Sequence, residues 1–246
     1  MDTTTLLIAV GACFFIAGGI KGVIGIGLPT VGVGLVGLFM PPAQAAAILI
    51  VPSLTTNIWQ AVAGGHFWVL LLRLWPFLVG VLFGSFLGAL WLPSDMSQAS
   101  RWMGIALVLY GLLGLFKVKF VVPPKHETWL GLVMGALTGA ITVATGVFAI
   151  PALPFMTALQ FDRNRLVQAI GITTTVTTIA LALALSHAGQ MSVDLFWASA
   201  IALAAACLGM MVGQWIRQRV SAETFRICFY AGLLILGLHL AVRGLF

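Results

Sequence analysis

The sequence predicts an all-α integral membrane protein with about eight transmembrane helices in two homologous halves, each opened by a glycine-rich broken helix. Of the 246 residues, 61% are hydrophobic and only 7% are charged, and the mean hydropathy is +1.12. Soluble domains carry roughly 25% charged residues, so this chain cannot solvate itself as a globule. Its apolar runs are long rather than short and alternating, which favours helices over a β-barrel.

Apolar stretches of membrane-crossing length recur along the chain, because a crossing helix needs about 20 mostly apolar residues. The eight stretches that we expect to cross are 5–26, 43–63, 70–92, 99–116, 128–148, 166–187, 195–216 and 224–243. Two further apolar pieces, 28–40 and 149–159, are too short to cross and predict half-helices or re-entrant segments. No basic residue precedes the first stretch, which therefore predicts a spanning helix and not a cleaved signal peptide.

A hydrophilic connection divides the chain into a first membrane repeat (1–119), a connecting loop (120–127) and a second membrane repeat (128–246). The pair Gly84 and Gly88 recurs as Gly209 and Gly213, an offset of 125 residues. Such small-residue pairs are common in membrane helices. The order of several matching landmarks is what supports an internal repeat. An even number of crossings per half predicts parallel repeats and an odd number inverted ones, and both remain open.

Each half begins with a glycine-rich break inside an apolar stretch. The first runs through Gly18-x-x-x-Gly22 to Gly25-Ile26-Gly27-Leu28-Pro29, and the second from Gly135-x-x-x-Gly139 to Gly146, with Pro151 after it. Glycine and proline in a membrane helix free backbone groups that only protein or a watery cavity satisfies. Two such breaks at matching places indicate a transporter substrate site. The four-residue glycine stripes themselves are more typical of close helix packing.

The first break offers a positive charge and a helix start to an anion. Lys21 is the charged residue that lies deepest inside an expected span, where a lysine costs about 2.5–3.5 kcal/mol. Either it faces the site or its amine reaches back to the interface. Beyond Pro29, the free N–H groups of a new helix, with the Thr30 hydroxyl, suit an oxyanion.

Polar side chains at matching places in both halves complete the predicted site. Asn57 and Gln60 lie three residues apart on one helix face, where they either bind substrate or join helices. Thr138 is the expected counterpart of Lys21, at an offset of 117 residues. The threonines either donate to the anion or bond their own helix. The predicted substrate-binding residues are Lys21, Gly22, Gly25, Gly27, Pro29, Thr30, Asn57, Gln60, Thr138, Thr142, Thr145, Gly146 and Thr174.

Several functions lack the residues that they require. All six acidic residues lie in loops or at span edges, which argues against a cation transporter or a carboxylate proton relay. The three cysteines match no metal or redox motif, and no nucleophile constellation predicts an enzyme. We therefore expect no catalytic residues, no metal and no cofactor. The net charge of +6 reflects membrane orientation or an anionic substrate, and with eight alternating crossings the basic residues divide six against five.

The residues of the two breaks resemble the TauE/SafE family of sulfite and organosulfur-anion exporters. The resemblance rests on Ala17–Gly22, the Gly25–Gly27 bend with its following proline, Gly135–Gly139 and Thr145–Pro151. It implies about eight helices in two related halves over essentially the whole chain. It also implies a plasma (bacterial inner) membrane permease for a small oxyanion such as sulfite or a sulfonate.

The function that we expect is transport of this anion by alternating access. The expected partners are the small anionic substrate and the lipid bilayer, with no nucleic acid, and a homo-oligomer is an option. A passive anion channel and a non-transporting membrane scaffold are the alternatives. The channel would keep the glycine bends but show flux without a coupling ion, whereas the scaffold would need no polar interior.

Overall fold

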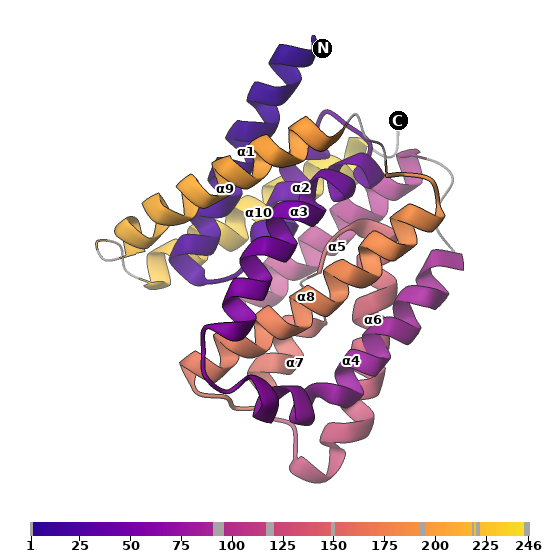
Figure 1. The fold of residues 1–246 in the computed structure, drawn as a ribbon, viewed down its shortest axis with the longest axis vertical. Coiled ribbons are helices and arrows are strands. Elements are labelled where there is room, and N and C mark those ends of the chain that lie inside the picture. Colours follow the sequence, from indigo (N-terminus) through magenta and orange to yellow (C-terminus); the bar gives the residue numbers. More distant parts are fainter. Residues whose placement is uncertain are drawn as a thin grey trace.

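The computed structural model describes residues 2–90, 96–116, 121–148, 151–191, 195–217, 219 and 222–243, and the regular elements in these ranges are all helices (Figure 1). They are α1 (Thr3–Ile24), α2 (Leu28–Val36), α3 (Pro42–Val62), α4 (Phe67–Leu90), α5 (Met96–Leu115), η1 (Pro124–His126), α6 (Glu127–Thr145), α7 (Ala152–Ala158), α8 (Arg163–His187), α9 (Phe196–Arg217) and α10 (Ala222–Arg243).

The all-helical membrane fold expected from the sequence is confirmed. Among the described residues, six helices are long and apolar enough to cross a membrane: α1, α3, α4, α6 together with η1, α8 and α9. The apolar parts of α5 and α10 are shorter, Ser100–Leu115 and Ile227–Val242. The count of eight crossings and the internal repeat stay predictions. The two pieces judged too short to cross contain α2 and α7, of nine and seven residues, although 149 and 150 lie outside the described residues.

The first glycine break turns the chain back on itself. Gly25 ends α1 in the left-handed conformation at φ 88°, and its N–H donates to the Lys21 carbonyl at 2.7 Å. Gly27, at φ 105°, then starts α2, a backbone conformation that other residues rarely adopt. Gly27 lies against Ile20 and Gly32 lies against Phe14, so α2 runs back along α1. The break is therefore a re-entrant turn and not a kink in one continuous helix.

The long helices pack in four close pairs, each joining the two halves of the chain: α1 with α9, α4 with α6, α5 with α10, and α3 with α8. Glycine makes the approach possible. A Cβ on Gly18 would overlap the backbone of Ala206, and one on Gly84 would overlap the backbone of Ala136. Without a hydrophobic driving force between helices in lipid, such close backbone packing is a main source of association. The packing role expected for the glycine stripes is confirmed.

Two of these pairs run parallel. Along α1 and α9, Gly18 meets Ala206 and Gly22 meets Met210, so the contacts advance together. Along α4 and α6, Gly80 meets Leu132 and Gly88 meets Ala140 in the same sense. Figure 1 shows α1 crossing beside α9 and α4 lying along α6.

The other two pairs run antiparallel. Between α3 and α8, Ser53 bonds Thr178, whereas the later Ala61 accepts from the earlier Gln168. Between α5 and α10, Gly104 meets Ala241 and Gly114 meets Tyr230. The α3–α8 pair crosses the middle of the molecule and carries most of the site described below.

Replacing Gly84 by alanine tests the close packing of α4 on α6. The added methyl has no room against the Ala136 backbone, and overpacking typically costs about 1–3 kcal/mol. We expect a lower melting temperature for the detergent-solubilised protein. Gly232→Ala in α10 is the matched control, because its Cβ would meet nothing within 4 Å and alanine favours a helix over glycine by roughly 0.5–1 kcal/mol. Equal melting of both variants would contradict the packing role.

Candidate functional site

The ammonium of Lys21 lies inside the helix bundle, one turn before the end of α1. Its side chain is only 3% exposed, so it does not reach back to an interface. Nζ donates to Thr56 Oγ1 at 2.9 Å and to Asn57 Oδ1, both on α3. The Asn57 amide in turn donates to Ser53 Oγ at 2.9 Å, and Ser53 is 3.2 Å from Thr178 Oγ1 on α8. A polar chain thus links α1, α3 and α8 through an otherwise apolar interior.

The charge of Lys21 has no carboxylate to balance it among the described residues. The ion pairs there join Arg73 to Glu127 and Arg165 to Asp162, away from Lys21. Both acceptors on Lys21 are neutral oxygens. A lysine has three donors, so this amine keeps donor capacity for a third group.

An inner cavity lies beside Lys21, between the first break and the segment that follows α6. Its walls are Lys21, Gly25, Ile26, Gly27, Pro29, Thr30, Asn57, Gln60, Tyr110, Phe148, Leu153, Ile170 and Thr174. The first turn of α2 forms part of the wall, and its N–H groups at Leu28 and Thr30 have no partner within the helix. The cavity volume is about 20 Å³, where a water molecule needs about 10–15 Å³. In this conformation it holds little more than one small group.

A larger vestibule of about 580 Å³ leads from one face of the bundle to Lys21. It is lined by Lys21, Gly22, Gly25, Thr56, Trp59, Gln60, Ala63, Gly64, His66, Asn164, Val167, Gln168, Met210 and Gln214. These residues come from the ends of α1, α3 and α9 and the start of α8. The vestibule and the inner cavity share Lys21, Gly25 and Gln60.

The side chain of Gln60 stands where the two spaces meet. Its Nε2 donates to the Val167 carbonyl at 2.7 Å and to the Gly25 carbonyl at 3.2 Å. The Gly25 carbonyl belongs to the glycine break, so one amide ties α3 to both the break and α8. Gln168 makes the reciprocal bond from α8, donating to the Ala61 carbonyl of α3 at 2.7 Å.

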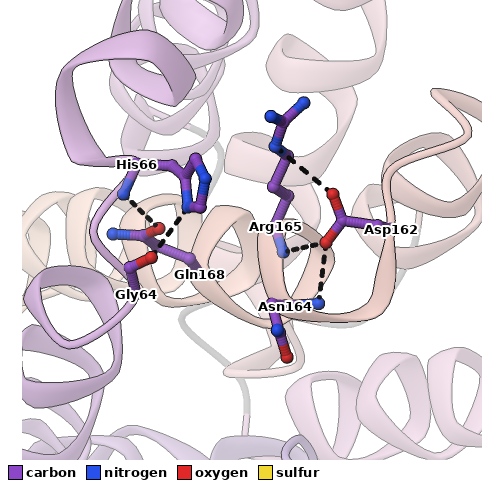
Figure 2. Close-up of polar contacts among 6 residues, drawn as sticks. All are labelled: Gly64, His66, Asp162, Asn164, Arg165 and Gln168. Atoms are coloured by element: carbon purple, nitrogen blue, oxygen red, sulfur yellow. Dashed lines mark hydrogen bonds and ion pairs between the residues drawn. The ribbon is translucent and has the colours of Figure 1, made fainter.

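The mouth of the vestibule is built by two short polar clusters, shown in Figure 2. In one, Gln168 Oε1 accepts the backbone N–H of His66 at 3.0 Å, and His66 Nδ1 lies 2.8 Å from the Gly64 carbonyl. This cluster fixes the connection from α3 to α4 against α8. This cluster consists of amide groups and the imidazole ring of His66.

In the second cluster, Asp162 caps the start of α8. Its carboxylate accepts the N–H of Arg165 at 3.0 Å and of Asn164 at 3.1 Å, and it pairs with the Arg165 side chain at 3.3 Å. The hydrogen bond from the Arg165 N–H is the main cause that lowers the pKa of Asp162 below its usual value, assisted by the Arg165 charge. This carboxylate therefore serves α8 and its own arginine at the mouth of the vestibule.

The structure gathers most of the sequence-predicted site residues in one place. Lys21, Gly25, Gly27, Pro29, Thr30, Asn57, Gln60 and Thr174 line the inner cavity, and Gly22 lines the vestibule.

The remaining four predicted residues lie elsewhere. Thr138 and Thr145 donate to carbonyls of their own helix, those of Met134 and Ile141, at 2.7 Å. Thr142 donates to the Val147 carbonyl, 3.4 Å away. Gly146, at φ 71°, ends α6. The threonine hydroxyls of this break are thus engaged locally, and none of the four residues lines either space.

Sequence reasoning missed several residues that form the two spaces, including Thr56, Tyr110, Phe148 and Gln168. Tyr110 is 3% exposed, and its ring meets that of Tyr230 edge-on at 5.4 Å. A signal was present, because these are the only two tyrosines of the chain and both lie in apolar stretches. The role of Gln168 depends on the crossing of α3 and α8, which no local pattern reveals.

Comparison with known proteins identifies one family. A model of the family described as sulfite exporter TauE/SafE matches residues 10–240 of the chain. No protein of curated function and no solved structure matches it.

Two substitutions of Asp162 distinguish its role as the N-cap of α8 from the effect of its negative charge. We expect Asp162→Ala to lower the melting temperature, because two N–H groups of α8 lose their acceptor, and Asp162→Asn to retain most of it, because asparagine also caps helices. Since the native pKa is lowered, the stability from the charge is present above about pH 4 and is lost as the pH falls through the native pKa. Melting temperatures measured between about pH 5 and about pH 2, the range in which this carboxyl group titrates, check this expectation. Equal pH dependence in Asp162→Asn would contradict it.

Proposed function

The chain belongs to the TauE/SafE sulfite exporter family, and on this premise we propose that it carries a small oxyanion across the plasma (bacterial inner) membrane by alternating access. Sulfite, a sulfonate or a related organosulfur anion is the proposed substrate. The observation that carries the proposal is the buried Lys21 ammonium beside a cavity, with only neutral oxygens as protein partners.

The energetics of a buried charge support an anionic ligand. Burial of an ammonium is costly unless it is paired and hydrogen-bonded. Thr56 and Asn57 supply hydrogen bonds to Lys21 but no negative charge. An anion in the inner cavity would supply the missing charge, and its departure would restore the cost. This difference in free energy between the occupied and the empty site would favour tight binding of the substrate in the occluded state.

The other donors around the cavity favour an oxyanion over a halide. The start of α2 offers the N–H groups of Leu28 and Thr30 and the positive end of the helix dipole. Several donors in different directions suit an ion with several oxygen atoms. Phe148, Leu153 and Ile170 give the cavity apolar walls, which would contact the apolar substituent of a sulfonate when the cavity widens.

We also propose that the two halves are inverted repeats. α1 lies parallel to α9 just as α6 lies parallel to α4, whereas α3 with α8 and α5 with α10 are antiparallel. A two-fold axis in the membrane plane, relating 1–119 to 128–246, would produce this arrangement.

The helix ends support one change in the register of the repeat. Gly25 donates to Lys21 and Gly146 to Thr142, each at 2.7 Å and each in a left-handed cap. Thr142, and not Thr138, is then the counterpart of Lys21. The proposed site therefore draws its charge from the first half alone.

Replacing Lys21 by methionine tests the proposal. Uptake of radiolabelled sulfite into proteoliposomes should fall about tenfold or more, the equivalent of roughly 1.4 kcal/mol of lost binding. The melting temperature without substrate should be unchanged or higher, because removal of an unpaired buried charge relieves its desolvation cost. A panel of thiosulfate, sulfonates and carboxylates as competitors would then rank the substrates.

Thr142→Val is the matched control at the proposed counterpart position. It removes a buried hydroxyl that the site does not use, so uptake should stay within about twofold of the unmodified protein, the small change expected where no substrate binding energy is lost. Undiminished uptake by Lys21→Met would overturn the anion site. An equal loss in Thr142→Val would overturn the conclusion that this hydroxyl lies outside the site.

A further inference from the structure

The helix directions assign each connection to one of two faces. The vestibule face carries the ends of α1, α3 and α9 and the starts of α4, α6, α8 and α10. His66, just before α4, bonds Gln168 near the start of α8, and Arg73 in α4 pairs with Glu127 at the start of α6, with 2.6 Å between Nε and Oε1. α5 runs from Met103, beside Gly37 at the end of α2, to the cavity, so its antiparallel partner α10 starts at the vestibule face.

Basic residues concentrate on the vestibule face. Positions there, by their place in the helices and connections, are Arg73, Lys125, Arg163, Arg165, Arg217, Arg219 and Arg226. Only Arg101 and Arg243 lie at the opposite face within the described residues, and Lys117 and Lys119 are outside them.

This distribution corrects the near-even division obtained from eight alternating crossings. Because α2 turns back, α3 enters the membrane from the same face as α1, and the connections from α3 to α6 change sides. The short α7 also turns back, since the Val122 N–H donates to the Ala158 carbonyl at its end, so the connections from α8 onward keep their sides. An excess of lysine and arginine in short connections marks the cytoplasmic face of a membrane protein.

The opposite end of the bundle is closed by apolar packing. Around the second break, Gly146 lies against Val33 and Ala46. Val143, Leu181 and Leu185 join the same buried cluster, each less than 5% exposed. A pocket of about 370 Å³ on that side is formed by the ends of α4 and α6 and the start of α5, and it does not include Lys21; its walls are Leu87, Gly88, Trp102, Ala140, Ile141, Ala144 and Thr145.

One buried polar atom lies near this closed region without a partner. Ser85 Oγ, in α4, makes no hydrogen bond within the described residues and faces Gly139 of α6. An unsatisfied buried hydroxyl is costly.

We infer that the vestibule is the cytoplasmic entrance for the anion, that Gln60 is its gate to the inner cavity, and that the route to the other face is sealed here by Val143, Leu181 and Leu185. The inference rests on the proposed transport function. Gln60 borders both spaces and holds the carbonyls of Gly25 and Val167 together. Rotation of this one side chain would join the vestibule to the cavity and leave the apolar seal intact.

Labelling of single cysteines tests the sidedness. In a background lacking Cys13, Cys207 and Cys228, an impermeant maleimide is applied to inside-out and right-side-out vesicles. Ala63→Cys, on the vestibule wall, should react only in inside-out vesicles. Gln190→Cys, in the exposed connection after α8, should react only in right-side-out vesicles. Leu185→Cys should react from neither side without substrate, and from the outside when sulfite is added.

The gate is tested by labelling at Thr30→Cys in the inner cavity. Adding Gln60→Ala should raise its labelling rate from the cytoplasmic side several-fold. Gln168→Ala is the matched control, since it removes an amide that also bridges α3 and α8 but does not border the inner cavity, and it should leave the rate unchanged. Thr174→Cys, on the opposite wall, provides a second probe if Thr30→Cys lowers the melting temperature.

The outcomes separate this inference from the proposed function. Reaction of Ala63→Cys from the outside would overturn the sidedness, and an equal rate with and without Gln60→Ala would overturn the gate. Reaction of Leu185→Cys from the outside without substrate would overturn the seal. If the labelling is as expected but Lys21→Met takes up sulfite normally, only the anion site is overturned.

Discussion

The hydrogen bonds from the Lys21 ammonium to α3 are the interaction on which the rest of the site depends. They place a positive charge where two membrane helices meet, and they require α3 to present Thr56 and Asn57 on one face. Ser53 and Thr178 extend the polar chain into α8. Because the described residues near it include no carboxylate, this network stabilises the position of the amine without neutralising it. A bound anion is the natural complement of such a network.

Glycine supplies the second constraint, in two physically different ways. At positions such as Gly84 and Gly209 the absence of a side chain lets two helix backbones touch, which makes α1 with α9 and α4 with α6 closely packed units. At Gly25, Gly27 and Gly146 glycine instead permits positive φ, so that the chain reverses within the membrane. The closely packed α1–α9 and α4–α6 pairs flank the two glycine breaks. Such pairs can tilt as units while the site stays near the breaks.

Sequence reasoning succeeded where local composition decides the structure. The apolar stretches, the two short pieces and the cavity-facing spacing of Asn57 with Gln60 follow from helix length and period. It failed where tertiary geometry decides. The hydroxyls of Thr138 and Thr145 donate to carbonyls of their own helix. These two residues are therefore close to the second break in sequence but do not line the cavity. The membrane orientation could not be decided from the sequence, because the turn of α2 shows only in its packing on α1.

The two ends of the molecule differ in what must be broken to open them. On the vestibule side Gln60 exchanges hydrogen bonds with carbonyls for hydrogen bonds with water, and such exchanges cost little net free energy. On the other side, parting Leu181 and Leu185 from the second break exposes apolar surface to water, at about 25 cal/mol per Å². A ligand can drive that opening only if it binds the open state more tightly. When the vestibule closes, water no longer reaches the Lys21 amine, and its unpaired charge is then most costly. An anion that neutralises this charge therefore binds most tightly in the state whose vestibule is closed and whose apolar seal is open. The buried lysine thereby couples occupancy of the site to opening of the apolar seal.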